Sequence, residues 1–253
     1  MEPRVLRHGL VDSTNERALA AIADGTARHG DVHVAEGQSA GRGRLGRTWA
    51  SASGEGLYLS LVLLPSSQPN PAALTMGAGL AVLESVRALG VREARLKWPN
   101  DVLAPCAKSR DAKLAGILVE ARGLDPARPH AVVGVGVNVL QRAFPPELLV
   151  ERAVTSLALL GCGATREEAL DVLLGHLGPR LELACRSPER VASDFADASQ
   201  LVGRHVAIRH GRGEERGRLT RLDLSGLELE RENGGRAHVA LEHAQAVEAL
   251  DRD

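Results

Sequence analysis

Aromatic residues are scarce in this sequence, which has only two tryptophans, two phenylalanines and one tyrosine among its 253 residues. Valine, leucine and alanine must therefore fill the core, and each tryptophan stands out as a residue with a special place. Hydrophobic residues make up 44% of the chain and charged residues 25%, which is ordinary for a globular protein. A chain of this length can bury one good core, or one core with a small appendage.

Cysteine is rare as well. Cys106, Cys162 and Cys185 are odd in number, widely spaced and without a CxxC pair. This pattern argues against a structural zinc site and a disulfide framework, and free thiols are typical of a reducing cytoplasm. No N-terminal apolar segment resembles a signal peptide, and the longest apolar run, residues 57–64, is too short to span a bilayer. We therefore expect a cytoplasmic protein without membrane contact.

The formal net charge is only -1, so no global field attracts nucleic acid, and any anion site must be built locally. The segment AEGQSAGRGRLGRTWAS, residues 35–51, meets this need. Its glycines allow left-handed backbone and close approach to a ligand, and its arginines can bind phosphate bidentately. These residues are Gly41, Gly43 and Gly46, and Arg42, Arg44 and Arg47. The motif alone is equally typical of a basic turn or an RNA contact. An RNA-binding loop would, however, be expected to have more aromatic residues for base stacking, and this loop has only Trp49.

A second motif is KWPND, residues 97–101. Pro99 favours extended geometry at Trp98, so we expect a strand to end here with Asn100 and Asp101 at its tip. Such a polar pair suits metal-bound water or a ribose, although an isolated Pro-Asn-Asp is also typical of an Asx turn.

Two apolar strand motifs follow. In KLAGILVE, residues 113–120, Lys113 is either a solvent-facing strand end or a point charge aimed at a carboxylate or phosphate, and Gly116 leaves room for a ligand. GVGVNV, residues 134–139, lacks the third glycine of a dinucleotide fingerprint. We interpret its glycines as close packing, and Asn138 as a possible outer-shell magnesium ligand.

The hydrophobic pattern predicts an α+β fold. Helices are expected over 15–24, 72–89 and much of 147–198, with a break or kink at Gly178-Pro179. Strands are expected over 31–36, 57–64, 94–98, 113–122 and 131–139. After residue 200, short alternating segments separated by Gly or Asn turns predict a small antiparallel barrel. We thus expect a mixed-sheet domain over 1–199, packed with helices, and an SH3-like β-barrel over 200–253.

In this order and spacing the motifs are not independent. DSTN, GQSAGRGRLGRTW, LYLSLVL, LKWPNDVL, KLAGILVE and VGVGVNV closely resemble the catalytic domain of biotin protein ligases, also called biotin–[acetyl-CoA-carboxylase] ligases, over residues 10–140. The resemblance implies that the protein makes biotinyl-5′-AMP from biotin and ATP with Mg²⁺, and has no tightly bound prosthetic group. It would then pass biotin to a lysine of a biotin carboxyl carrier protein domain, and would act as a monomer or homodimer.

The resemblance also implies roles for individual residues. Those expected to bind biotin are Ser13, Thr14, Asn15, Gln38, Gly41, Arg42, Arg44, Lys113 and Gly116. Those expected near the nucleotide are Arg44, Arg47, Trp49, Asn100, Asp101 and Asn138, with Trp49 against the adenine. Arg42 and Lys113 would be catalytic, Asp101 and Asn138 would be weak metal ligands acting through water, and the glycine-arginine loop would close as a lid over the adenylate.

Three features depart from the family pattern. DSTN begins at residue 12, which leaves no space for the helix-turn-helix of the repressor members, so we expect no DNA binding. The polar connection 102–112 is long, and we expect either a second mobile loop near the nucleotide or an inert insertion. The C-terminal ALEHAQAV replaces a more usual glycine-rich segment, which puts nucleotide contacts from that module in question.

Three other functions remain open at this point. Lipoate or octanoyl transferases resemble the same fold, although the GRGRLGR and KWPND motifs favour biotin. A nucleic-acid-binding protein would use the loop and the barrel, but a basic domain would then be expected. An inactive scaffold homologue would be expected to lack some of the motif residues, and all of them are present.

Overall fold

A seven-stranded mixed sheet forms the body of the computed structural model, which describes residues 3–106, 109–121 and 129–250. The strand order is β1-β2-β3-β7-β6-β5-β4. The bounds are β1 (Arg4–Val11), β2 (Asp31–Gln38), β3 (Gly56–Leu63), β4 (Arg95–Lys97), β5 (Asp101–Cys106), β6 (Ser109–Glu120) and β7 (Ala131–Asn138). Strands β1 and β2 are parallel and the other neighbours pair antiparallel, so the mixed sheet expected from the sequence is confirmed.

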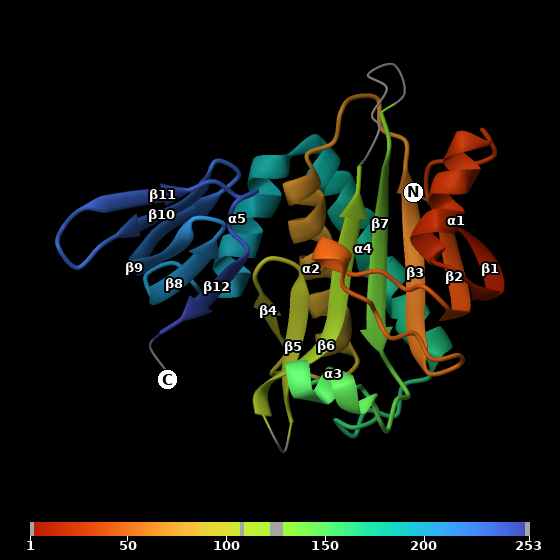
Figure 1. Ribbon diagram of the computed structural model, residues 1–253. Coiled ribbons are helices and arrows are strands. Elements are labelled where there is room, and N and C mark those ends of the chain that lie inside the picture. Colours follow the sequence, from red (N-terminus) through yellow and green to blue (C-terminus); the bar gives the residue numbers. More distant parts are fainter. Residues whose placement is uncertain (1–2, 107–108, 122–128, 251–253) are drawn as a thin grey trace.

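Helices cover both faces of this sheet (Figure 1). On one face α2 (Pro71–Ala88) lies against the strands, with α4 (Arg166–Arg186) and α5 (Pro188–Ser199) packed on it. On the other face α1 (Thr14–Ala23) packs through Ala18 on Val62 and Val132. Helix α2 begins where Asn70 Oδ1 accepts hydrogen bonds from the amides of Ala72 and Ala73 at 3.0 and 3.1 Å, a good N-cap before a proline.

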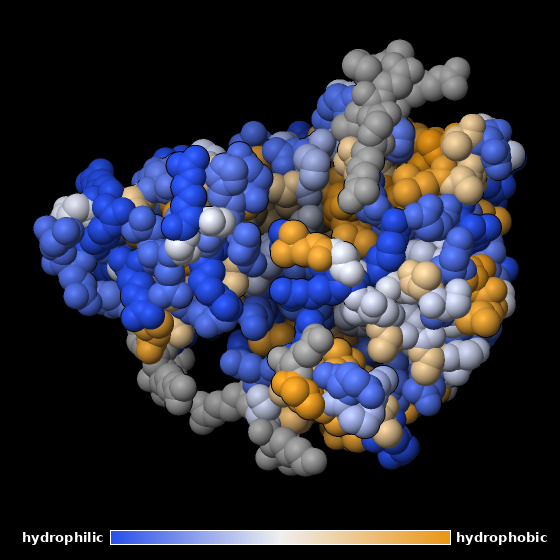
Figure 2. Space-filling view, in the orientation of Figure 1, coloured by the Kyte–Doolittle hydropathy of each residue, from blue (hydrophilic) through white to orange (hydrophobic). Residues whose placement is uncertain are grey.

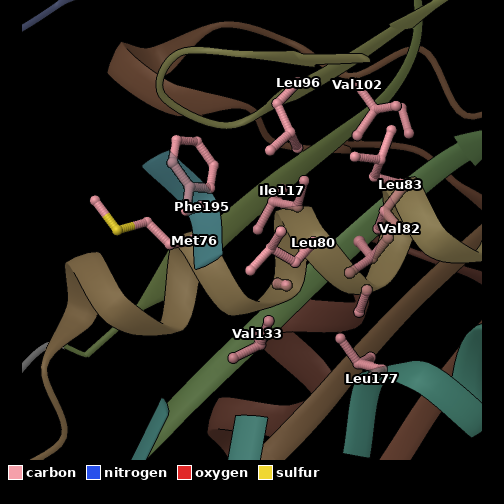
Figure 3. Packing of buried hydrophobic residues seen from close by; sticks show 14 of the residues in the cluster. Met76, Leu80, Val82, Leu83, Leu96, Val102, Ile117, Val133, Leu177 and Phe195 are labelled. Carbon is pink, nitrogen blue, oxygen red and sulfur yellow. The ribbon is translucent and has the colours of Figure 1, made fainter. Parts of the chain in front are cut away.

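The core is aliphatic, as the composition requires. Every residue of β3 is buried, and α2 presents buried alanines, leucines and valines to the sheet beneath it (Figure 3). Burial of a leucine or valine side chain contributes about 1.5–3 kcal/mol, so these small contacts together dominate stability. Two of the few aromatic residues lie together, where the rings of Trp98 and Phe195 meet edge to face with centroids 6.1 Å apart.

Helix α4 corrects the expected break at Gly178-Pro179, because it continues from Arg166 to Arg186 through Pro179, whereas a kink there stays a prediction. Leu177 and Leu181, on either side of the proline, are both fully buried. A Cβ on Gly77 of α2 would lie 3.1 Å from the carbonyl oxygen of Arg180, so the two helices are in close contact here. Packing on both sides thus outweighs the hydrogen bond that a proline removes.

Two further corrections concern strands. The connection 102–112 is a β-hairpin rather than a loop, because β5 and an extended β6 pair from Asp101 to Ser109, and residues 107–108 lie outside the described residues. Strand β1 was not predicted, because its half-exposed sequence RVLRHGLV lacks a clear alternation. It is held at the sheet edge by pairing with β2 and by Arg4, whose guanidinium bonds the buried Asp31 carboxylate.

After α5 the chain forms a second, antiparallel sheet. Its strands are β8 (His205–His210), β9 (Gly213–Asp223), β10 (Gly226–Glu230), β11 (Arg236–Val239) and β12 (Ala246–Ala249), in the order β11-β10-β9-β8-β12. Within the described residues the outer strands β11 and β12 do not pair with each other, so closure into an SH3-like barrel stays a prediction. The indole nitrogen of Trp98 donates to the Ala244 carbonyl at 2.9 Å and thereby joins this sheet to the main body.

Across the described residues, no helix combines the length and hydrophobicity needed to cross a membrane.

Candidate functional site

One cavity collects the motif residues that are far apart in the sequence. It lies on the α1 face of the sheet, where the loop 41–49 crosses β6 and β7 (Figure 1), and its empty volume, including the part open to solvent, is about 980 Å³. Of the residues expected from the sequence, all but Gly41 line it: Ser13, Thr14, Asn15, Gln38, Arg42, Arg44, Arg47, Trp49, Asn100, Asp101, Lys113, Gly116 and Asn138. The structure therefore brings the predicted site residues together, although it leaves their individual roles to experiment.

The floor of the cavity is made of paired glycines. Gly116 of β6 and Gly136 of β7 are register partners, and the ring of Trp49 lies on both. A Cβ on Gly136 would be 2.5 Å from Trp49 Cε2, and one on Gly116 would be 2.9 Å from Trp49 Cζ3. Glycine is required at these positions because any side chain would occupy the space of the indole. The indole nitrogen is buried without a hydrogen-bond partner among the described residues.

Lys113 stands beside this floor. Its Nζ lies 2.7 Å from Asp101 Oδ1 and 5.1 Å from the centroid of the Trp49 ring. Burial lowers the pKa of Lys113 from its ordinary value, and the nearby Asp101 carboxylate opposes this shift. A lysine that is desolvated but still paired with a carboxylate provides a positive charge at a fixed point, ready for an anionic ligand.

The N-terminus of α1 forms one wall. Ser13 precedes the helix and is buried, yet its side chain makes no capping hydrogen bond. The Thr14 amide donates to Gln38 Oε1 at 2.8 Å, and Gln38 Nε2 donates to the Ser51 hydroxyl at 2.8 Å. These bonds fix the orientation of the Gln38 amide, and Ser13, Thr14 and Asn15 all line the cavity at this wall.

The glycine-arginine loop is a compact hairpin. Arg42 and Thr48 form an antiparallel bridge, the Trp49 amide donates to the Gly41 carbonyl at 2.9 Å, and a short 3₁₀ turn spans Arg44–Gly46. Leu45 at its tip is 73% exposed, and Figure 2 shows a small hydrophobic patch among hydrophilic residues in the middle of this face. The fold of the loop directs Arg42 and Arg44 to the cavity.

Gly41 lies just outside the cavity, at the base of this hairpin. A Cβ there would be 2.5 Å from the Trp49 carbonyl oxygen and 3.0 Å from Gln38 Nε2. The glycine therefore allows the two sides of the hairpin to close, and its effect on a ligand would be indirect.

Arg42 is held by two carboxylates. Its Nη1 lies 2.6 Å from Glu16 Oε1 and its Nη2 lies 2.5 Å from Glu120 Oε2, while its Nε is buried without a partner among the described residues. Arg44 is close enough to Asp101 for a favourable interaction, and burial lowers the pKa of its guanidinium from the ordinary value. Both guanidinium groups remain permanent cations beside the cavity.

Two asparagine side chains that line the cavity donate hydrogen bonds to backbone carbonyls. Asn100 Nδ2 donates to the Ile117 carbonyl at 2.7 Å. This bond attaches the turn that follows β4 to strand β6, and it places Asp101 beside Lys113. Asn138 Nδ2 donates to the Thr155 carbonyl at 2.9 Å. Among the described residues no group of three His, Cys, Asp or Glu side chains could form a metal cage. Asp101 is the single acidic residue among those that line the cavity.

Several lining residues were not predicted. Gly134 and Gly136 were interpreted as packing glycines, yet they also line the cavity, and Phe144, Leu148 and Arg152 come from the segment around α3 (Pro146–Glu151). The scarcity of phenylalanine was a possible signal for Phe144. Arg152 carried none, because only the tertiary fold brings it here: the Lys113 amide donates to the Ala153 carbonyl at 2.9 Å and so adds this segment to β6.

Comparison with known proteins agrees with this arrangement. Residues 9–138, which contain the glycine-arginine loop and both glycine strands, match the model of the biotin/lipoate A/B protein ligase family. The chain belongs to this family. The cavity described above is therefore built almost wholly from the family region, and the segment around α3 lies beyond it.

Relatives and solved structures of this family extend the match. A biotin–[acetyl-CoA-carboxylase] ligase of Mycobacterium tuberculosis is 39% identical over 209 residues, covering 80% of this chain and 73% of that protein. The bifunctional ligase/repressor BirA of Escherichia coli is 37% identical over 175 residues, which is 69% of this chain and about half (52%) of that protein. A biotin protein ligase of Aquifex aeolicus in complex with biotin and ATP superimposes with a TM-score of 0.76 at 28% identity, covering 97% of this chain and 99% of that one.

Proposed function

We propose that this protein is an ATP-dependent biotin protein ligase. It forms biotinyl-5′-AMP from biotin and ATP with release of diphosphate, and then transfers the biotinyl group to a lysine of a biotin carboxyl carrier protein domain with release of AMP. One observation carries the proposal: Arg42, Arg44, Arg47, Lys113 and Arg152 line a cavity whose floor is glycine and whose single lining acid is Asp101. Such a site suits an apolar molecule that carries a carboxylate and must meet a phosphate.

The chemistry requires two anions to approach each other. An oxygen of the biotin carboxylate attacks the α-phosphorus of ATP, and the bond to the bridging oxygen of diphosphate breaks. Lys113 and the arginines would neutralise the charge on the carboxylate and on the phosphoryl oxygens, so positioning and fixed charge lower the barrier without an enzyme nucleophile. Lys113 suits this task because Asp101 orients its ammonium group.

Each wall of the cavity would then bind a different part of the substrates. The polar head of biotin would form hydrogen bonds with Ser13, Thr14, Asn15 and Gln38. Its aliphatic chain would lie on Gly116 and Gly136 once the indole of Trp49 has moved away from them. Trp49 and Arg47 would then contact the nucleotide, with Asn100, Asp101 and Asn138 on the same side. The hairpin of residues 41–49 would shield the mixed anhydride from water until the acceptor lysine arrives.

Magnesium is part of the proposal and would come with the nucleotide. Mg²⁺ commonly keeps several waters and binds through one or two carboxylates plus substrate phosphates, and an all-protein cage is unusual. A cavity with the single carboxylate of Asp101 fits this use, with Asn138 as a partner through water. When bound, the ion would supply further positive charge at the phosphates.

The wider organisation of the protein also belongs to the proposal. Residues 1–199 would be the catalytic domain, and residues 200–253 would be a separate SH3-like barrel. Support comes from the two separate sheets. A cytoplasmic location, supported by the three free cysteines, and the absence of DNA binding complete the proposed picture.

The test is a transfer reaction with competing acids. Purified protein, ATP, Mg²⁺ and a biotin carboxyl carrier domain are incubated with equal concentrations of biotin and lipoate, and the carrier is analysed by mass spectrometry. The proposal predicts one biotinyl group on one carrier lysine. A lipoyl group in its place would keep the chemistry and reassign the substrate, and an unmodified carrier would reject ligase activity.

A further inference from the structure

The last residue of β6 is a buried carboxylate that does not line the cavity. Glu120 is 6% exposed, and it lies on the same face of the strand as Leu118 and Gly116, two and four residues earlier. Burying an ionised carboxylate is costly unless partners satisfy it. Its position directly behind the cavity wall makes the identity of those partners important.

Both partners of Glu120 are residues that do line the cavity. Glu120 Oε2 accepts a hydrogen bond from Asn15 Nδ2 at 2.8 Å and another from Arg42 Nη2 at 2.5 Å. Asn15 belongs to α1 and Arg42 to the hairpin of residues 41–49, so a single buried oxygen atom bonds side chains from two segments. The Asn15 amide is also held on its other side, where its Oδ1 accepts from the Ser60 hydroxyl at 2.5 Å.

Arg42 has a second carboxylate partner, Glu16, whose side chain differs from that of Glu120 in burial. The side chain of Glu16 is 43% exposed and that of Glu120 only 6%. Exposed ion pairs contribute little because water and salt screen them, whereas a desolvated, charge-assisted hydrogen bond is strong and directional. Glu120 therefore dominates the orientation of the guanidinium, whose buried Nε is the nitrogen still without a partner in the described structure.

We infer that Glu120 is a positioning residue for biotin: through Asn15 and Arg42 it fixes two side chains of the biotin site without lining the cavity itself. The inference rests on the proposed function of the cavity. It assigns a role to the end of the KLAGILVE motif, which the sequence pattern alone marks only as a strand end.

The test is Glu120→Gln, which keeps the shape of the side chain and removes its charge. The amide oxygen can take the place of Oε2 and accept the same two hydrogen bonds, but it carries no charge, so the bonds to Asn15 and Arg42 lose their charge assistance. We expect the biotin Kd and KM to rise by roughly tenfold while the ATP KM stays unchanged, in line with the loss of charge-assisted hydrogen bonds. The matched control is Glu167→Gln, which removes an exposed carboxylate in the first turn of α4 that bonds Arg7 of β1, and neither residue lines the cavity.

The comparison of the biotin constants with the ATP KM decides between the outcomes. Selective loss of biotin affinity in Glu120→Gln, with normal kinetics in the Glu167→Gln control, supports the positioning role. Equal biotin Kd values in Glu120→Gln and the wild type would overturn it, and so would an equal rise in the KM values of biotin and ATP. Wild-type protein that forms no biotinyl-AMP would reject the proposed function itself, a result distinct from either of these.

A second measurement does not depend on activity. In the Arg42→Ala variant Glu120 is a buried carboxylate without its cationic partner, so adding Glu120→Gln should raise the melting temperature of that variant. In the wild-type background the same substitution should leave the melting temperature unchanged or lower it. Shifts of equal size and sign in the two backgrounds would show that Glu120 and Arg42 are not coupled, and would overturn the inference even if the protein is a ligase.

Discussion

The indole of Trp49 lies directly on Gly136, so closely that a methyl group at position 136 would be 2.5 Å from Trp49 Cε2. Together with Gly116, this glycine forms the floor on which we place the biotin chain. The floor of the cavity is therefore covered by one of its own side chains, and in the proposed function biotin displaces the indole to reach the two glycines. This movement would bring Trp49 toward the nucleotide side of the cavity.

The displacement of Trp49 gives the first prediction. Biotin should change the tryptophan fluorescence of the wild-type protein, because the indole leaves an apolar floor and the neighbouring Lys113 ammonium. Trp49→Phe should lose this change. Trp98→Phe should keep it, because Trp98 is buried at the contact with Ala244, away from the cavity. A biotin-dependent signal that survives in Trp49→Phe would contradict the displacement.

Gly116→Ser gives the second prediction. A Cβ at this position would be 2.9 Å from Trp49 Cζ3 and 3.2 Å from Lys113 Nζ, so a serine would crowd both side chains and the substrate. Crowding of this kind costs about 1–3 kcal/mol, and we expect it as a raised biotin KM. Gly175→Ser is the control, because no atom lies within 4 Å of a Cβ built there. A normal biotin KM in Gly116→Ser would remove Gly116 from the site.

The motifs, taken as a set through their resemblance to one family, predicted most of the residues that line this cavity. Arg42, Arg44 and Arg47 of GRGRLGR, Asn100 and Asp101 of KWPND, and Lys113 and Gly116 of KLAGIL all reach it. The glycines of GVGVNV show the limit of such reasoning. A glycine that allows strands to pack and a glycine that lines a cavity cannot be distinguished in a sequence. Only the position of Trp49 in the structure shows that Gly136 lines the cavity.

Lys113 gives the third prediction. Lys113→Ala should slow single-turnover adenylation by roughly 10²-fold or more, the usual effect of removing a charged group from a transition state, with a smaller effect on ATP binding. Unchanged single-turnover adenylation would contradict the role. ATP affinity measured in the same samples separates binding from chemistry.

The pH dependence of adenylation follows from the same residue. The protonated form of Lys113 is the useful one, and burial lowers its pKa. Adenylation by the wild type should therefore fall with rising pH below the ordinary lysine range near ~10.4. Lys113→Arg stays charged throughout, so its rate should lack this alkaline decline. Parallel pH profiles for the two proteins would exclude Lys113 as the group that titrates.

Tyr58 gives the fourth prediction, which concerns stability. Burial raises the pKa of this single tyrosine to about 12, and its hydroxyl donates to the Ala52 carbonyl at 3.0 Å. The folded state therefore keeps the proton longer than the unfolded state, whose pKa is about 10. The stabilisation is complete below about pH 10 and is lost as the pH rises toward 12. Denaturant unfolding across this range should show the loss in the wild type and a smaller one in Tyr58→Phe, and equal slopes would contradict the assignment.

Other features could not be read from the sequence, for physical reasons. Strand β1 is polar and irregular, and becomes a strand only because β2 offers it an edge. Pro179 is tolerated because leucines on both sides of it are held by α2. Arg152 and Glu120 reach the site region through pairing and burial that have no local signature. In each case tertiary contacts outweigh local preference.

The measurement that tests the account most directly is a calorimetric titration of biotin with and without ATP and Mg²⁺, followed by mass spectrometry of the mixture. The account predicts that biotin binds, and that biotinyl-5′-AMP appears only when ATP and Mg²⁺ are present. The absence of biotin binding, or binding without adenylate formation, would contradict the proposal that this cavity joins a carboxylate to a nucleotide.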